Sequence, residues 1–224
     1  MTDQMRPYRM KRRAELEQAT RRRVIESLVE LHGTVGPART SISLIARRAG
    51  VRRSTVYRHF PDERALLTAC SSHWLAVHPF PNVKPWAAIA DPSMRLRAAL
   101  NQLYAYYSQN ERMLTNLLRD EVTMPILRRL LDGYRSYLAH ARDTLMRAVD
   151  GTGAARRQAR AAIGHALAFH TWRSLVREQG VDETQAVDLM CRLIAAASSK
   201  LSQAPLARPP HRANEQRALP LRPA

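Results

Sequence analysis

Apolar side chains recur at the spacing of an α-helix through most of the sequence. In the first such stretch Val24, Leu28 and Leu31 share one face, and Gly33 with Gly36 marks its end. No stretch shows the convincing alternation of apolar and polar residues that is typical of a β-strand. The pattern therefore predicts an all-α protein of about nine helices. The expected helices cover residues 11–32, 42–49, 52–60, 63–77, 93–109, 111–121, 125–149, 155–179 and 182–202.

Local signals place several of these boundaries. Ser41 and Asp62 stand where N-caps are expected, because their side-chain oxygens accept hydrogen bonds from free backbone N–H groups. Gly50 stands between two short helices, where a tight turn needs a positive φ. Prolines in and beside residues 78–91 predict a loop there. Later breaks are expected at Asn110, Pro125, Gly151 with Gly153, and Gly180.

Charge is distributed unevenly along the 224 residues. The chain holds 36 Lys+Arg against 19 Asp+Glu, a formal net charge of +17, and residues 1–60 alone hold 14 against 5. A polyanion is the expected partner of so asymmetric a field, although a solubilising tail would give the same excess. An anionic membrane surface fits less well, because no helix separates a Lys/Arg face from a bulky apolar face.

Several function classes find little support. No apolar run is long enough to cross a bilayer and no secretory signal is present, so we expect a soluble, cytoplasmic protein. Cys70 and Cys191 lack the spacing of a disulfide framework or a zinc site. The neighbouring carboxylates Asp120 and Glu121 diverge by about 100° on a helix, which indicates polar structure rather than an acid/base pair. With no phosphate-binding loop and no nucleophile motif, we expect neither an enzyme nor a cofactor nor a metal. The histidine pairs have i,i+5 spacing, which suits no metal site: His73 with His78, and His165 with His170.

The most informative segment is SISLIARRAGVRRSTVYRHF, residues 41–60. Its apolar positions place Ile45 and Ala46 on the inner face of one short helix and Val56 on the inner face of the next. Ala46 is small, as a steep crossing of two helices requires, and Gly50 lies between them. This spacing fits a helix-turn-helix.

The same segment strongly resembles the DNA-binding domain of the tetracycline-repressor (TetR) family of bacterial transcription regulators. The matching residues are the T-S-I-x-x-I-A-x-x-A-G-V run from Thr40 to Val51, the T-V-Y-x-H-F run from Thr55 to Phe60, and Leu66–Leu67. They cover roughly residues 20–70. The resemblance implies a ligand-responsive regulator of transcription, and we expect a repressor that a small-molecule effector releases from its operator. The competing expectation is an architectural DNA-binding protein that ignores sequence.

A helix in the major groove meets base edges with its N-terminal side chains and phosphates with its flanks. Arg52, Arg53, Ser54 and Thr55 form that N-terminal end. Arg53 is suited to a bidentate contact with guanine, which discriminates by about 1–3 kcal/mol, and Ser54 to a base or sugar contact. The plainer alternative for Arg53 is an arginine that points at solvent.

Phosphate contacts are expected around this helix. Ser41 offers a hydroxyl at a helix N-terminus, and Ser43 lies on the outer face, within reach of a base edge. The resemblance implies phosphate contacts for Tyr57 and His59. Their alternatives are packing against the first helix for Tyr57 and a buried core position for His59.

The chain departs from the family pattern at the start of the fourth helix. A lysine that contacts phosphate is common there, whereas this chain has Glu63 followed by Arg64. Glu63 would repel a phosphate, so the contact depends on Arg64 taking over the role.

One helix-turn-helix makes too few contacts for tight specific binding, so we expect a homodimer on palindromic double-stranded DNA. The last two helices carry wide apolar faces, which agrees with the four-helix dimer interface that the resemblance implies. A purely intramolecular core is the alternative. The expected interface residues are Ala161, Gly164, Ala168, Leu189, Leu193 and Ala197.

The resemblance also implies an effector pocket in the larger helical domain. Aromatic walls with a few polar groups suit such a pocket, although aromatic side chains at helical spacing also build ordinary cores. The candidate lining residues are Tyr104, Tyr107, Tyr137, His140 and Trp172.

The expected organisation is therefore a disordered basic arm over residues 1–12, a helix-turn-helix domain over 13–62 and an effector-binding and dimerisation domain over 63–203. A Pro/Arg-rich tail over 204–224 completes it and has too few large apolar side chains to fold. The arm either adds DNA contacts or plays no part in binding. Its basic residues are Arg6, Arg9, Lys11, Arg12 and Arg13.

Overall fold

The computed structural model describes residues 5–147, 149 and 153–199. Within them the chain forms helices and no strand, which confirms the predicted all-α class. The helices are α1 (Met5–Thr34), η1 (Pro37–Arg39), α2 (Ile42–Ala49), α3 (Arg53–His59), α4 (Glu63–Val77), α5 (Lys84–Ala87), α6 (Pro92–Asp120), α7 (Pro125–Leu130), α8 (Asp132–Met146), α9 (Gly153–Ala166), α10 (Phe169–Arg173), the π-helical η2 (Ser174–Glu178) and α11 (Glu183–Ser199).

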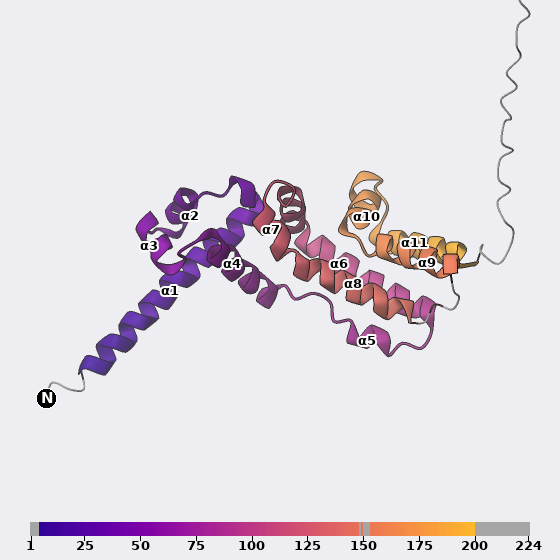
Figure 1. Cartoon of the computed structure of the whole chain (residues 1–224), viewed down its shortest axis with the longest axis horizontal. Coiled ribbons are helices and arrows are strands. Elements are labelled where there is room, and N and C mark those ends of the chain that lie inside the picture. The colour runs from indigo at the N-terminus through magenta and orange to yellow at the C-terminus, as the bar shows by residue number, and fades with distance from the viewer. Residues whose placement is uncertain (1–4, 148, 150–152, 200–224) are drawn as a thin grey trace, which may run out of the picture.

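Two separate hydrophobic cores divide the molecule. The first core lies among α1, α2, α3 and the start of α4, which together we call the N-terminal unit. The second lies among α5 to α11, the C-terminal unit, where α6 and α8 run side by side and α9 packs on α11 (Figure 1). The first core consists of Val24, Ile25, Leu28, Leu31, Ile45, Ala46, Ala49, Val56, Phe60, Leu66 and Cys70.

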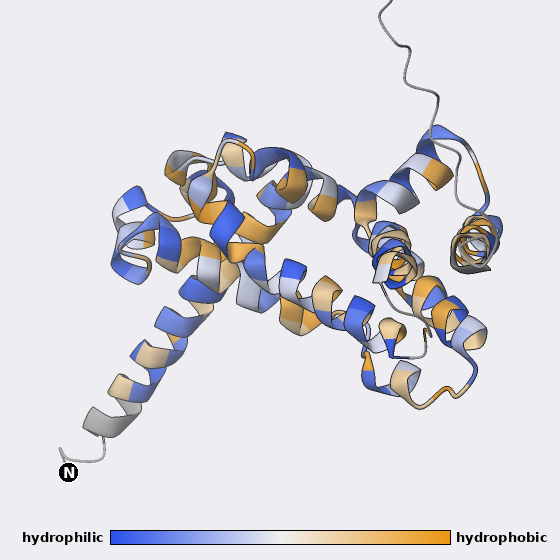
Figure 2. Cartoon of the chain, turned by 45° about the vertical axis from the view of Figure 1, so that its right-hand side comes forward, coloured by the Kyte–Doolittle hydropathy of each residue, from blue (hydrophilic) through white to orange (hydrophobic). Residues whose placement is uncertain are grey.

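Helix α1 begins at Met5 rather than near Lys11, so the expected disordered arm is helical from residue 5 onward. Pro7 lies in the first turn, where a helix tolerates proline because the missing N–H has no intrahelical partner. The first half of α1 projects away from both units and is mostly hydrophilic (Figures 1 and 2). Residues 1–4, the side chains of Arg6 and Arg9, Gly151 and the tail 204–224 lie outside what the structure describes.

Asn110 does not break a helix, contrary to expectation, because its side chain serves the helix that it lies in. Its Nδ2 donates to the carbonyl of Tyr106, one turn earlier, at 2.8 Å, and α6 runs unbroken from Pro92 to Asp120. The stretch 125–149 forms two helices, α7 and α8, which turn at Leu131.

The stretch 155–179 is also interrupted, after Ala166. The carbonyls of Ala166 and Leu167 accept hydrogen bonds from the buried hydroxyls of Tyr104 and Tyr107, at 3.1 and 2.5 Å. These partners satisfy backbone groups that an unbroken helix would have paired internally. The chain therefore restarts at Phe169 as α10.

In the described part of the chain, no helix is both long and apolar enough to cross a membrane.

Candidate nucleic-acid interface

The helix-turn-helix is built as the sequence predicted. Ser41 caps α2, its hydroxyl accepting a hydrogen bond from the Leu44 backbone N–H at 3.2 Å. Gly50 ends the helix with a φ of 64°, in the left-handed region where glycine meets no steric cost. Ile45 and Val56 are buried in the first core and hold α2 against α3. The helices before and after the turn are thus both held in the first core.

The N-terminal end of α3 faces solvent. Arg52, Arg53 and Ser54 are exposed and Thr55 is half-buried. Neither arginine has an ion-pair partner among the described residues, whereas Arg48 on α2 is tied to Glu30 of α1. Arg52 and Arg53 are therefore free to meet an anion.

Tyr57 and His59, both expected to contact phosphate, differ in exposure. Tyr57 is 47% exposed and lines a groove of about 320 Å³ together with Ser41, so its ring is available to a phosphate. His59 is half-buried, and its buried Nε2 has no hydrogen-bond partner within the described residues. A core histidine would normally be paired. Because this nitrogen is buried, it reaches an external phosphate only if the ring turns outward.

The two residues that open α4 face different grooves. Glu63 lines the groove that contains Ser41 and Tyr57. Arg64 lines a second groove, between α1 and α4, with Arg21 and His73. The structure therefore places an acidic side chain beside the expected phosphate contacts and does not bring Arg64 to them.

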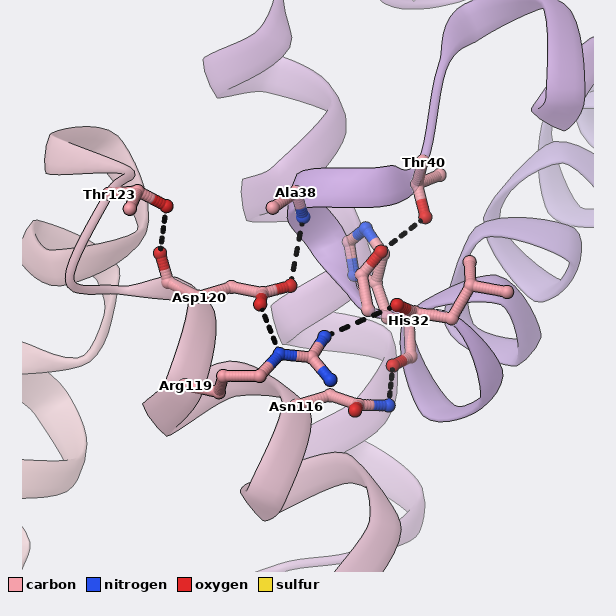
Figure 3. Close-up of polar contacts among 9 residues, drawn as sticks. His32, Ala38, Thr40, Asn116, Arg119, Asp120 and Thr123 are labelled. Carbon is pink, nitrogen blue, oxygen red and sulfur yellow. Dashed lines mark hydrogen bonds and ion pairs between the residues drawn. The ribbon is translucent and has the colours of Figure 1, made fainter.

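A polar cluster that the sequence did not reveal joins the C-terminal end of α6 to the segment between α1 and α2 (Figure 3). The Asp120 carboxylate accepts hydrogen bonds from the Ala38 backbone N–H at 2.9 Å and from Arg119 Nε at 2.6 Å. Asn116 Nδ2 donates to the His32 carbonyl at 2.8 Å, and Arg119 Nη2 to the carbonyl of residue 35 at 3.2 Å. We call these bonds from Asn116, Arg119 and Asp120 the Asp120 clasp. The residues that it joins across the two units lie more than 80 positions apart in the sequence, so no local pattern signals it.

Asp120 is ionised although it is buried. Burial alone would raise the pKa of its carboxyl, but the hydrogen bonds from Arg119 and from the Ala38 N–H outweigh that effect and lower the pKa below its usual value. Its side chain is only 5% exposed. The clasp therefore holds a buried charge whose partners come from both units.

Beside the clasp, His32 and Cys70 lie between the two units. With Leu117 and Leu127 they line a mostly apolar cavity of about 50 Å³. Burial lowers the pKa of His32 to about 4, against an opposing effect of Asp120, and burial raises the pKa of Cys70 to about 12. Both side chains are uncharged at neutral pH.

The candidate effector residues are mostly packed in the second core. Tyr104, Tyr107 and Trp172 are fully buried, and both tyrosine hydroxyls bind backbone carbonyls. Tyr137 stacks on Phe80 with ring centroids 4.6 Å apart. The structure does not bring His140 into this cluster, because its side chain is exposed on α8.

The candidate dimer residues form no part of the deep core. Ala161 and Leu193 are exposed, Leu193 by 52%, and the others are half-buried. The half-buried residues are Gly164, Ala168, Leu189 and Ala197. Apolar surface thus remains open along α9 and α11.

In the part of the chain that the structure describes, no three His, Cys, Asp or Glu side chains are grouped so as to hold a metal ion.

Residues 24–70 match the family model of bacterial regulatory proteins, tetR family. Among curated proteins no relative matches the sequence significantly. The fold is similar to that of a TetR-like transcriptional regulator from Rhodococcus sp. RHA1 (16% identity, TM-score 0.58, 79% of this chain and 94% of that one). It is also similar to a TetR transcription regulator from Haloarcula marismortui (13% identity, TM-score 0.53, 81% and 97%). These similar proteins are regulators of transcription rather than enzymes.

Proposed function

Because the chain belongs to the TetR family of DNA-binding transcriptional regulators, we propose that it is a cytoplasmic bacterial repressor. Two copies bind a palindromic operator, and a small molecule releases them. The observation that carries the proposal is the exposed N-terminal end of α3. Arg52 and Arg53 have no ion-pair partner there among the described residues, on a helix that the first core holds in place. Rigid presentation of unpaired donors is what base-edge contacts require.

The flanks of α3 favour phosphate contacts on both sides. The Ser41 hydroxyl and the exposed Tyr57 hydroxyl supply them directly, and His59 supplies another once its ring turns its buried, unpaired Nε2 outward. Such contacts fix register and orientation, while Arg53 and Ser54 read sequence. Arg64 is left as a contact to more distant phosphates, because it faces the groove with Arg21.

The open apolar surface on α9 and α11 supports a homodimer. Leu193 is exposed on α11, and the neighbouring helix α9 exposes the small residue Ala161, so the same surface of a second copy can approach closely. Two-fold pairing places two copies of α3 on successive major-groove faces, and an inverted repeat follows from that symmetry.

The effector site is proposed at the aromatic cluster of the second core. Within the described residues, Tyr137 Oη and Trp172 Nε1 are buried and have no hydrogen-bond partner. Buried donors without partners are costly, so a ligand with acceptor oxygens would be stabilised by both. Entry of that ligand requires the cluster to open.

Selection of bound sequences from random duplex DNA at near-physiological salt tests the proposal. We expect an inverted repeat. If the protein enriches no sequence, with or without a library of small molecules, sequence-specific regulation is contradicted and an architectural role is favoured. Affinity measured against salt on selected and unselected DNA then gives the specificity ratio.

A further inference from the structure

The two units are joined by two kinds of contact. One is the packing of α1 on α6 and of α4 on α7, around the apolar cavity lined by Cys70, Leu117 and Leu127. Apolar contacts have no preferred direction, so this junction tolerates small rotations. The other is the Asp120 clasp, in which each bond has a defined donor, acceptor and angle.

The clasp holds the segment that leads directly into α2. The Ala38 N–H bound by Asp120 is three residues before Ser41, the N-cap of α2. Between them, Thr40 Oγ1 donates to the Gly36 carbonyl at 2.8 Å, which closes the short η1 turn. A displacement of the C-terminal end of α6 should therefore move the start of α2 by a similar amount.

Gly36 shows how closely the two parts approach. Its φ is +92°, a conformation that other residues rarely adopt, and a Cβ at this position would lie 2.5 Å from Asp120 Oδ2. The backbone of the loop thus rests directly on the carboxylate, without a side chain between them.

A buried charge is a poor means of gaining stability alone, because desolvation offsets most of its attraction. In some proteins a buried charge fixes a unique geometry instead, and the geometry that this one bears on is the angle between the two units. We propose that the Asp120 clasp fixes this angle and thereby sets the spacing of operator half-sites that the dimer accepts. This inference rests on the proposed dimeric operator binding.

The expected consequence of breaking the clasp is a loss of spacing selectivity. With the clasp broken, the units keep the packing of α1 on α6 and of α4 on α7 but lose the directed bonds between them. Their angle then varies more widely, and a dimer with pivoting units adapts to several spacings. Each base pair added between half-sites moves one of them by about 3.4 Å and rotates it by about 35° around the duplex. A rigid dimer rejects such a change, whereas a pivoting dimer follows it.

The test uses full-length protein and the selected operator, with spacers one and two base pairs longer and shorter, together with a duplex that carries one half-site. Asp120→Asn removes the charge while keeping the shape, and Asn116→Ala removes only the bond to the His32 carbonyl. Gln109→Ala, an exposed position on the same helix, is the matched control. We expect the preference of the wild type for its native spacing, about tenfold per base pair, to fall to about threefold or less in both clasp variants. Half-site affinity stays within about twofold.

Three results would overturn the inference. Unchanged spacing selectivity in folded clasp variants contradicts it directly. Equal losses on the half-site and on every spacing show that the clasp only shapes or stabilises the N-terminal unit. If Asp120→Asn does not fold, Asn116→Ala decides between the outcomes. A wild type that shows no spacing preference, yet binds two half-sites more tightly than one, also contradicts it. A wild type that binds the full operator no more tightly than the single half-site contradicts dimeric operator binding itself, so that failure is distinguishable from failure of the clasp alone.

Discussion

His32 Nδ1 lies 3.6 Å from Cys70 Sγ, and this contact joins α1 to α4 in the interior between the two units. Burial holds the pKa of His32 at about 4, below the value near 6.5 that an exposed or unfolded histidine has. Below pH 6.5 the unfolded chain therefore binds a proton that the folded chain does not. Stability is lost as the pH falls from about 6.5 to about 4 and levels off below that.

This difference in pKa corresponds to roughly 3 kcal/mol over that window. Asp120 adds a loss of the same sign at lower pH, since its folded pKa is depressed. We expect urea unfolding to show a smaller decline between pH 7 and pH 4 in His32→Gln than in the wild type. His170→Gln, at an exposed position, should follow the wild type. Parallel curves for wild type and His32→Gln would refute the assignment.

Glu63 should weaken DNA binding in the wild type. It lines the same groove as Ser41 and Tyr57, where a phosphate is expected, and a carboxylate there repels it. Glu63→Gln should therefore raise affinity by about two- to fivefold at low salt and less at high salt. Glu178→Gln, at an exposed position on η2, is the control for a simple change of net charge. Equal gains in both variants would contradict a local effect.

Arg53→Ala should cost about 1–3 kcal/mol on the operator and relax the selected sequence at one position in each half-site. Tyr57→Phe removes only a hydroxyl at the flank, and it should weaken binding to all sequences by a similar factor. Repeating the selection with each variant distinguishes the two roles. An unchanged motif for Arg53→Ala would show that another side chain reads the base.

Leu193→Glu should separate the proposed dimer, because it would place a charge in the apolar interface that we propose between two copies. We expect its dissociation constant to rise by about tenfold or more in sedimentation experiments. Gln185→Glu introduces the same charge at another exposed position of α11 and should leave the assembly intact. Equal effects of the two substitutions would place the interface elsewhere.

Local chemistry allowed the helix-turn-helix to be predicted closely. The caps at Ser41 and Asp62 and the turn at Gly50 depend on residues a few positions apart, and the structure confirms all three. The match of residues 24–70 to the tetR-family model gives the same result by a separate route. The expected roles of individual side chains in DNA binding stay predictions.

The larger unit was harder to predict because distant contacts decide it. A helix ends at Ala166 and Leu167, although neither residue is a helix breaker. Their carbonyls accept hydrogen bonds from buried tyrosine hydroxyls of α6 instead. Asn110 carries a break signal, yet its side chain bonds within the helix. In the sequence, the adjacent carboxylates Asp120 and Glu121 indicate only ordinary polar structure, and Ala38, which binds Asp120, carries no side-chain signal at all.

Because α6 is unbroken, the directions in which side chains point at its two ends are fixed relative to each other. Tyr107, in the aromatic core, and Asn116, in the clasp, lie on one continuous helix. Inserting a single residue between them would turn the clasp by about 100° about the helix axis and shift it by about 1.5 Å. In segment 78–91 only α5 is anchored in the second core, by the buried Trp86, and the loop residues on either side of it carry no such rotational constraint. Insertions and deletions should therefore be tolerated in the loop residues of segment 78–91 and not in α6, whose length sets the position of the clasp relative to the aromatic core.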